Sequence, residues 1–343
     1  MKRVVVIGGG FAGTTVARNL EDKFNVTLID AEDFFEYTPG ILRTLVEPEH
    51  ADKLHAKHKD YLPKAKIVVG YARDIKDKSV VLSNGKKINY DYLIIASGSS
   101  YNAPIKEENI FFATRVKNLL KAYNKIQKSK KIVIVGGGVV GVELTAEIAT
   151  KYKDKKISLI HSNPRLMNRN NVKTSEYCKK FLEKRGVEII FNERIEHNDK
   201  KNLIGESGKS YPYDAVFYTV GIKPNVDFIK GDLTKYVSRG VVVNEYLQIP
   251  DKKNIFVAGD VSGVAEEKTA QNAEKHGRLI ADNLIALHEG KEMKKYTPKK
   301  RMMVISLGKY SGIIEYKNFV MGGFIPAMMK SFIEKMVMRK FKG

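Results

Sequence analysis

A strand, a glycine cluster, a helix and a second strand follow one another twice in this chain, at residues 2–30 and 130–161. Each copy opens on an apolar run, RVVVI or KIVIV, and continues into glycines with the spacing G-x-G-x-x-G. A buried parallel strand, such a turn and a helix make the βαβ unit that binds the pyrophosphate of a dinucleotide at the helix N-terminus. The duplication therefore predicts two Rossmann-like, doubly wound α/β domains, each with its own dinucleotide site.

In the first copy the glycines are Gly8, Gly10 and Gly13, and the next strand ends at Asp30. Gly8 allows the tight turn, Gly10 leaves the backbone open to the pyrophosphate, and Gly13 lets the helix pack closely on the strand. Asp30 is placed to accept hydrogen bonds from a ribose. Because strand, glycines, helix and acid occur in register, we predict a dinucleotide site here and not an ordinary turn.

The second copy carries Gly136, Gly138 and Gly141, but the acid is missing from the end of its second strand. That strand ends in His161, followed by serine and asparagine. Without a carboxylate to pair with a ribose diol, both NADH and NADPH remain open as the bound nucleotide. Either His161 contacts the nucleotide or it merely ends the strand.

The rest of the chain indicates that the second copy is inserted within the domain that the first copy begins. At 343 residues the chain is long enough for two domains with separate cores. Residues 79–101 read as short strands around an Asn84-Gly85 turn. The run IFVAGD at 255–260 is expected to be a strand that rejoins the first unit, before a helix over 268–288. We therefore predict a first dinucleotide domain in two pieces, 1–105 and 229–290, a second domain inserted at 106–228, and a C-terminal α+β unit at 291–343.

The C-terminal unit has strand-like runs at 301–308 and 310–323 and then a helix over 325–342. At 100° per residue one face of this helix is apolar, and most of its charged residues lie elsewhere. A basic amphipathic helix can lie in the interface of an anionic membrane, and it can equally dock on its own domain or on a second subunit in a homodimer. The apolar face comprises Ile325, Met328, Met329, Phe332, Ile333 and Met336.

The net charge and the cysteine count limit the kinds of partner and site that we expect. Lys and Arg total 60 against 39 Asp and Glu, a net charge of +21, which favours anionic partners. The basic residues are scattered, so they form either a generally solvated surface or a docking face, and without a nucleic-acid module we do not expect nucleic acid.

The single cysteine, Cys178, excludes an internal disulfide and a thiolate cluster, and we expect no metal site. With no signal peptide or spanning apolar run, we expect a cytoplasmic protein, free or on the inner face of a membrane.

Five motifs occur along the chain: IGGGFAG, YDYLIIASGS, IVGGGVVGVELTAEI, VFYTVGIKPN and NIFVAGDVSG. With them the chain resembles, over essentially its whole length, the two-dinucleotide-binding-domain flavoproteins of the pyridine nucleotide-disulfide oxidoreductase superfamily. It is most similar to type II NADH:quinone oxidoreductases and to AIF-like ferroptosis-suppressor flavoproteins, the latter through ISLIHSN, NEYLQIP and the tail after ISLGKYSG. The resemblance implies FAD on the first domain and NADH or NADPH, as substrate, on the second.

The resemblance also implies roles for individual residues. Asp260 would accept hydrogen bonds from the FAD ribitol, and its alternative role is a helix cap. Glu143, expected on the first turn of the second-domain helix, would lie near the nicotinamide and the flavin, or else contact the helix dipole. Gln271 would face a quinone headgroup or cap its helix, whose first amides would stabilise reduced flavin. The remaining cofactor contacts implied are Pro39, in the stretch YTP, and Ser97, Gly98, Gly221, Gly259 and Ala270.

The absent cysteines separate this chain from two groups of relatives. Disulfide reductases of this fold use a CxxxxC pair and sulfide:quinone reductases use reactive cysteines, whereas Cys178 stands alone in a helical segment where we expect it to be exposed or packed. The function implied is hydride transfer from NAD(P)H to N5 of FAD, followed by reduction of a quinone. The alternatives are a soluble NAD(P)H reductase for a small acidic redox protein, and an AIF-like flavoprotein that binds nucleic acid.

Overall fold

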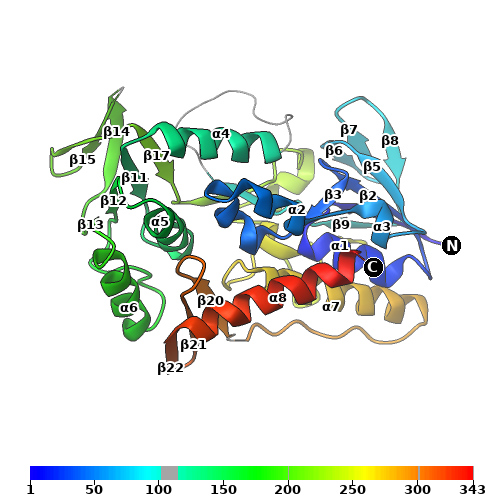
Figure 1. The fold of residues 1–343 in the computed structure, drawn as a ribbon. Helices are drawn as coiled ribbons and strands as arrows, with labels where there is room; N and C mark the ends of the chain where they lie inside the picture. Colours follow the sequence, from blue (N-terminus) through cyan, green and yellow to red (C-terminus); the bar gives the residue numbers. More distant parts are fainter. Residues whose placement is uncertain (102–114, 200, 300–301, 343) are drawn as a thin grey trace.

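The computed structural model of the chain describes all residues except 102–114, 200, 300–301 and 343. Two α/β units, each built on a parallel sheet, lie beside one another, and the C-terminal helix runs across both (Figure 1). The α/β fold class with two Rossmann-like units, predicted from the duplicated glycine motif, is confirmed.

The first unit is built on a five-stranded parallel sheet in the order β19-β9-β1-β2-β5. Its central strands are continuous apolar runs because both faces of the sheet are covered. The run predicted at 255–260 does rejoin this sheet, since Ile255 lies opposite Leu93 in parallel register. The strands are β1 (Arg3–Ile7), β2 (Asn25–Asp30), β5 (Lys66–Val69), β9 (Tyr92–Ile95) and β19 (Ile255–Val257).

Two helices, α1 (Phe11–Leu20) and α7 (Ala270–His288), pack closely against each other on this sheet. A side chain at Gly277 would lie 2.6 Å from the Ala12 carbonyl oxygen, so glycine is needed for the close approach. The helix predicted from residue 268 begins two residues later, because the hydroxyl of Thr269 caps it by accepting from the Asn272 amide. The antiparallel strands β6 (Ala72–Lys76), β7 (Ser79–Leu82) and β8 (Lys87–Asn89) complete the unit around the predicted Asn84-Gly85 turn.

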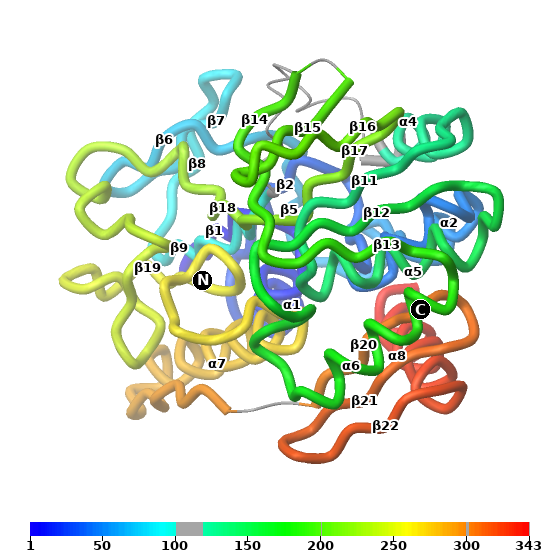
Figure 2. The backbone as a smooth tube through the Cα atoms, turned by 90° about the vertical axis from the view of Figure 1, so that its left-hand side faces the viewer, coloured from blue at the N-terminus to red at the C-terminus, as the bar shows by residue number. Residues whose placement is uncertain are grey.

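The second unit repeats the design with a four-stranded parallel sheet in the order β13-β12-β11-β17 (Figure 2). Helix α5 follows the second glycine cluster as α1 follows the first. Its elements are α4 (Arg115–Lys128), β11 (Lys131–Val135), α5 (Val139–Lys151), β12 (Lys156–Ile160), α6 (Val172–Glu183), β13 (Val187–Ile190) and β17 (Ala215–Tyr218), with the antiparallel strands β14 (Ile195–Asp199), β15 (Asn202–Gly205) and β16 (Ser210–Pro212).

Two short strands join the units where the chain crosses between them. β10 (Ser99–Tyr101) pairs antiparallel with β18 (Ile222–Pro224). The domain boundary predicted between residues 105 and 106 lies outside the described residues.

The smaller elements are β3 (Phe34–Glu36), the 3-10 helix η1 (Thr38–Leu45), η2 (Pro48–His50), α2 (Ala51–Leu54), β4 (His55–Lys57), α3 (His58–Tyr61), η3 (Gly231–Tyr236) and η4 (Gly259–Val261).

The C-terminal unit is a three-stranded antiparallel sheet followed by α8 (Phe324–Lys342). Its strands are β20 (Met303–Ser306), β21 (Gly312–Tyr316) and β22 (Phe319–Gly323). Of the alternatives for the apolar stripe of this helix, docking on its own domain does not fit the structure, because Phe332 is 65% exposed and Ile325 63%. A membrane surface and a second subunit remain as its alternatives. The inward face is instead made by Lys330, Glu334, Met338 and Phe341, which contact the two α/β units. Pro326 is buried against the C-terminal sheet at Gly312.

Candidate functional site

The N-terminus of α1 forms an open cradle. Gly10 is the N-cap residue, and no side chain caps the first-turn N–H groups. A Cβ atom at Gly10 would meet nothing within 4 Å, whereas one at Gly13 would lie 1.9 Å from the Gly8 carbonyl oxygen. Gly8 has φ +104° and no room for a side chain beside the Ala96 carbonyl. Free amides facing open space suit the pyrophosphate of a dinucleotide.

Asp30 ends β2 next to this cradle, where the glycine motif predicts a ribose contact. Its Oδ1 accepts from the Ala31 amide at 2.9 Å, and its Oδ2 lies 2.8 Å from Nε2 of His58. The Asp30 side chain is 18% exposed, so it can still reach a ligand. A carboxylate has about four acceptor positions, which leaves capacity for ribose hydroxyls.

The N-terminus of α5 has the same geometry. Gly138 is an N-cap residue without a side-chain cap, and a Cβ there would also meet nothing within 4 Å. A Cβ at Gly141 would lie 1.8 Å from the Gly136 carbonyl oxygen. Two such cradles in one chain give it room for two dinucleotides.

His161 occupies in the second unit the place of Asp30 in the first, one residue after Ile160. Its Nδ1 accepts from the Gly137 amide at 3.1 Å, and only 8% of the residue is exposed. Burial lowers the pKa of His161, so the ring is neutral. In this position His161 supports the glycine loop, where the first unit has the carboxylate of Asp30.

Asp260 lies in η4, directly after β19, and accepts from the Ser99 hydroxyl at 3.0 Å. The preceding Gly259 has φ +74°, and its amide donates to Nδ1 of the buried His276 at 3.1 Å. A Cβ atom at Gly259 would lie 3.3 Å from that of Ala12 and 3.5 Å from that of Ala273, so the loop lies between the N-terminal ends of α1 and α7. At α7 the Thr269 hydroxyl accepts from the Asn272 amide, and Ala270 and Gln271 form the start of the first turn. The Gln271 side chain is exposed there, with Nε2 3.5 Å from the Met302 carbonyl oxygen.

The linker residues implied as cofactor contacts lie where the chain crosses between units. The Ser97 hydroxyl donates to the Asn225 carbonyl at 2.7 Å, and the Asn225 amide donates to the Gly98 carbonyl at 3.0 Å. Gly98 and Gly221 have φ +69° and +66°, values that favour glycine. These residues hold the two crossings together at the edge of the first site.

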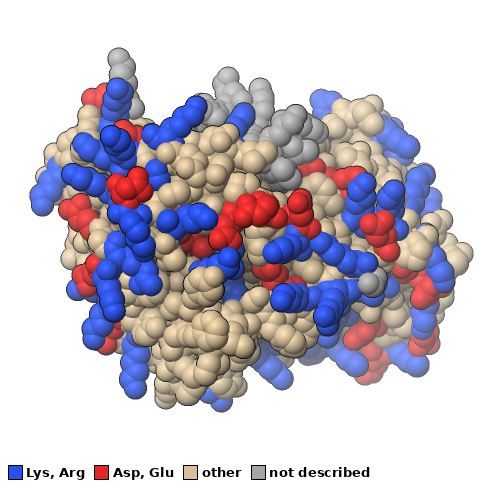
Figure 3. Space-filling model, in the orientation of Figure 1, with Lys and Arg blue, Asp and Glu red and all other residues tan. Residues whose placement is uncertain are grey.

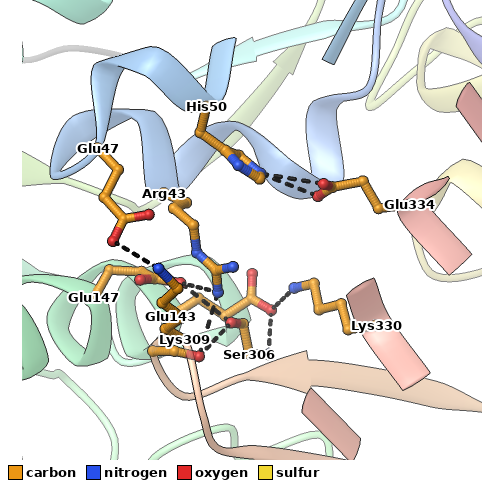
Figure 4. A network of polar contacts seen from close by, with 10 residues as sticks. Arg43, Glu47, His50, Glu143, Glu147, Ser306, Lys309, Lys330 and Glu334 are labelled. Atoms are coloured by element: carbon orange, nitrogen blue, oxygen red, sulfur yellow. Dashed lines mark hydrogen bonds and ion pairs between the residues drawn. The ribbon is translucent and has the colours of Figure 1, made fainter. Parts of the chain in front are cut away.

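Glu143 lies in a small polar cavity between α5, η1 and the C-terminal unit (Figure 4). It is the fifth residue of α5, so the expected first-turn position is wrong. Its Oε1 accepts from Lys330 Nζ at 2.5 Å and from the Ser306 amide at 2.7 Å. Pro39 lines the same cavity, whose volume of about 30 Å³ admits one or two water molecules.

Several polar residues of this cavity were not predicted from the sequence. Glu147, one turn after Glu143, pairs with Arg43 at 3.1 Å, and Glu334, one turn after Lys330, contacts His50 at 3.2 Å. Glu143 and Glu147 are four residues apart, as are Lys330 and Glu334, so the sequence alone predicts that each two lie on one face of their helix. In α8, however, Lys330 and Glu334 lie opposite the apolar stripe, a position that normally indicates solvent.

Cys178 is fully buried and its Sγ lies 3.6 Å from Met167 Sδ. Burial raises the pKa of its thiol to about 12. The structure thus selects packing in the core of the second unit over exposure, and the thiol is unreactive at neutral pH.

Comparisons with solved structures agree with this architecture. The sulfide:quinone oxidoreductase from Aquifex aeolicus superimposes with a TM-score of 0.86 at 21% identity, covering 100% of this chain and 92% of that one. NDH2 from Plasmodium falciparum in complex with NADH gives a TM-score of 0.86 at 16% identity, covering 99% and 96%. At these identities the likeness establishes the shared fold.

Comparisons of sequence go further. Apoptosis-inducing factor homolog B of Dictyostelium discoideum is 32% identical, over 98% of this chain and 96% of its own length. Ferroptosis suppressor protein 1 of Taeniopygia guttata is 31% identical over 96% and 92%. The family model described as pyridine nucleotide-disulphide oxidoreductase matches residues 2–277, which include both cradles. The chain belongs to the pyridine nucleotide-disulphide oxidoreductase family.

Proposed function

We propose that this protein is an FAD-dependent oxidoreductase that oxidises NADH or NADPH and reduces a quinone at a membrane surface. Membership of the family and the two open helix N-termini support FAD on the first unit and the nicotinamide nucleotide on the second. A sulfide:quinone oxidoreductase and an NADH-bound NDH2 share the fold. The feature that favours a membrane-borne quinone is the orientation of α8.

Helix α8 presents opposite chemistry on its two faces. Lys330, on the inward face, pairs with Glu143 in the cavity, while Phe332 is exposed on the outward face. Exposed apolar side chains continue onto the neighbouring hairpin. In Figure 3 the surface over the hairpin and the N-terminal half of α8 carries few charges, whereas basic side chains gather over the C-terminal half. This membrane-facing patch, as we name it, comprises Tyr310, Tyr316, Phe319, Phe324, Ile325, Met328, Phe332 and Met336.

Such a patch is larger than the isolated apolar residues that soluble proteins normally expose. Lys335, Arg339, Lys340 and Lys342 on the same helix suit anionic headgroups. Among the residues the structure describes, no helix has the length and hydrophobicity to span a bilayer. A helix lying in the interface would hold the protein at the lipid surface, where quinone is dissolved.

The residues of the chain have separate tasks in this function. FAD, when bound, supplies the chemistry that accepts a hydride from the nicotinamide and passes electrons on to the quinone. The α1 amides and Asp30 bind its pyrophosphate and ribose, and the α7 amides offer positive charge near the ring system. Lys330 Nζ donates to Glu143 behind α8 and so holds the C-terminal helix against the nucleotide-binding unit.

The test compares two quinone supplies. Quinone reduction is measured with a water-soluble short-chain ubiquinone and with ubiquinone-10 in anionic vesicles, for the native protein and for the double variant Met328→Ser, Phe332→Ser. Burial of one such side chain in lipid contributes about 1.5 kcal/mol or more to the free energy of binding. Removing two exposed apolar side chains should therefore lower vesicle binding and vesicle-borne turnover by about tenfold or more. Turnover with the soluble quinone should be unchanged.

Failure with both quinones, while NAD(P)H still reduces the flavin, would refute the quinone assignment. Equal turnover of the variant on vesicles would refute the membrane role of the patch. If the native protein is a dimer and the double variant a monomer by light scattering, the patch is a dimer interface.

A reductase for a small acidic redox protein is the second candidate, supported by the net charge of +21. Electrostatic steering makes the rate with such a partner fall steeply as salt rises. Reduction of an acidic ferredoxin without vesicles, with that salt dependence and faster than quinone reduction, would favour it.

A further inference from the structure

We infer that the C-terminal end of α8 is a positioning element of the FAD site, acting through the chain of contacts Phe341, Tyr61, His58 and Asp30. This inference rests on FAD binding at the first cradle and is independent of the identity of the electron acceptor. It makes His58 and Tyr61 positioning residues for the carboxylate that meets the adenosine ribose.

His58 is the centre of this chain of contacts. It is fully buried, with Nδ1 2.5 Å from the Tyr61 hydroxyl and Nε2 2.8 Å from Asp30 Oδ2. Burial, assisted by the negative charge of Asp30, raises the pKa of Tyr61, so its hydroxyl keeps its proton and donates to Nδ1. The imidazole Nε2 then carries the hydrogen and donates it to Asp30.

The backbone leaves Asp30 and His58 little freedom. A Cβ atom at Gly9 would lie 2.2 Å from Asp30 Oδ2 and 2.6 Å from the His58 ring, so the glycine loop, the acid and the imidazole fill one volume. The short helix α3 carries both His58 and Tyr61, and the His58 amide donates to the Asp33 carbonyl just beyond β2. Any displacement of Tyr61 is therefore passed through His58 to the carboxylate.

The last turn of α8 closes the other side of Tyr61. The Phe341 ring meets Tyr61 edge-on at a centroid distance of 4.8 Å and stacks on Phe35 at 4.1 Å. Phe35 in turn packs edge-on against Phe11, the first residue of α1, at 5.0 Å. Aromatic contacts of this kind define ring positions as well as burying area.

Two polar contacts fasten the same turn to the first unit. Arg18 of α1 donates to the Lys340 carbonyl at 2.7 Å, and Lys342 donates to the Asp52 carbonyl at 2.8 Å. The end of α8 thus contacts the FAD-binding unit on the inward side, at residues that the membrane-facing patch does not include. Deleting the whole helix would disturb FAD binding and membrane binding together, and point variants are needed to separate them.

The experiment measures flavin release from the full-length holoprotein. Release of FAD after dilution is followed by flavin fluorescence, and release of FMN is followed after exchanging it into the same protein. FMN lacks the adenosine ribose that Asp30 contacts, so the comparison isolates this end of the site. The variants are His58→Leu, His58→Gln, Tyr61→Phe and Phe341→Ala, with Phe332→Ala, an exposed phenylalanine of the same helix, as the matched control.

FAD release should accelerate about tenfold or more in His58→Leu and about threefold or more in Tyr61→Phe and Phe341→Ala, since each 1.4 kcal/mol is a factor of ten. His58→Gln, which keeps a donor towards Asp30, should recover part of the loss. FMN release should be the same in all variants, and Phe332→Ala should match the native protein for both flavins.

Unchanged FAD release in His58→Leu and Phe341→Ala would overturn the inference. Equal acceleration of FAD and FMN release would overturn it as well, because it would indicate general loosening of the fold. Tyr61→Phe removes one oxygen atom and keeps the ring that Phe341 contacts, so it provides an answer even if a larger substitution fails to fold. None of these results depends on whether quinone is reduced.

Discussion

Lys330 of α8 donates to Glu143 of α5 across 2.5 Å, so the C-terminal helix and the nucleotide-binding unit share one largely buried charge pair. Both side chains are mostly shielded, at 17% and 9% exposed. The Ser306 amide donates to the same carboxylate oxygen, which ties in the C-terminal sheet. One carboxylate therefore fastens the C-terminal unit to the second unit at the cavity.

Replacing Lys330 by methionine should leave Glu143 with only the Ser306 amide among these donors. Removing one partner of a buried pair is destabilising, and with a remaining hydrogen bond and partial exposure we expect a loss of about 1–3 kcal/mol. Urea unfolding of the holoprotein measures this loss, and quinone turnover should fall with it. Lys335→Met, an exposed position of the same helix, should change neither the free energy of unfolding nor turnover with the soluble short-chain quinone. Comparable losses in both variants would contradict a specific role for the pair.

Gly10→Ala and Gly138→Ala should separate the two dinucleotide sites. Both positions have ordinary negative φ, −78° and −76°, and a Cβ there meets no protein atom within 4 Å, so neither variant should lose stability. Each methyl group would enter the space for a pyrophosphate. Gly10→Ala should weaken FAD binding and Gly138→Ala should raise the KM for NAD(P)H, each by about tenfold or more. Loss of FAD from both variants would show that the sites are not independent.

His161→Asp should make the second site select NADH. The substitution places a carboxylate where Asp30 stands in the first unit, and Asp can accept from the Gly137 amide as His161 does. A carboxylate repels the 2′-phosphate of NADPH, and kcat/KM for NADPH should fall by about tenfold to a hundredfold, or about 1.4–2.7 kcal/mol. The kcat/KM for NADH serves as the internal control. Parallel losses with both nucleotides would mean that the variant only damages the glycine loop.

Cys178 should resist thiol reagents in the folded protein. Burial raises the pKa of its thiol to about 12, so native protein at pH 8 should not react with Ellman's reagent, whereas urea-unfolded protein should react at once. Because the folded pKa is raised, the contribution of this thiol to stability is complete below the unfolded value near 8.5 and declines as pH rises towards 12. Rapid labelling of the native protein would contradict the buried position.

Local patterns in the sequence were sufficient to predict both dinucleotide units. The glycine spacing, the apolar strand before it and the helix after it act within about thirty residues, and the physics of a strand, a tight turn and a helix N-terminus depends little on the rest of the chain. The return of β19 to the first sheet was predicted for a similar reason, since a short apolar run of this kind needs burial on both faces. The start of α7 lies two residues later than helix propensity predicts, because Thr269 caps the helix.

The tertiary structure alone decided which face of α8 turns inward and what Asp30, Glu143 and His161 contact. Hydrophobic periodicity identifies an apolar stripe on a helix, and such a stripe usually faces the protein interior. It does not show whether the opposite, polar face has buried partners that turn the helix the other way. Here Lys330 and Glu334 find partners more than 180 residues away in sequence, on Glu143 and His50, and polar groups satisfied in this way can be buried. Pairings between segments so far apart leave no periodic signal, so the sequence defined the two nucleotide cradles and the fold supplied the side chains that complete them.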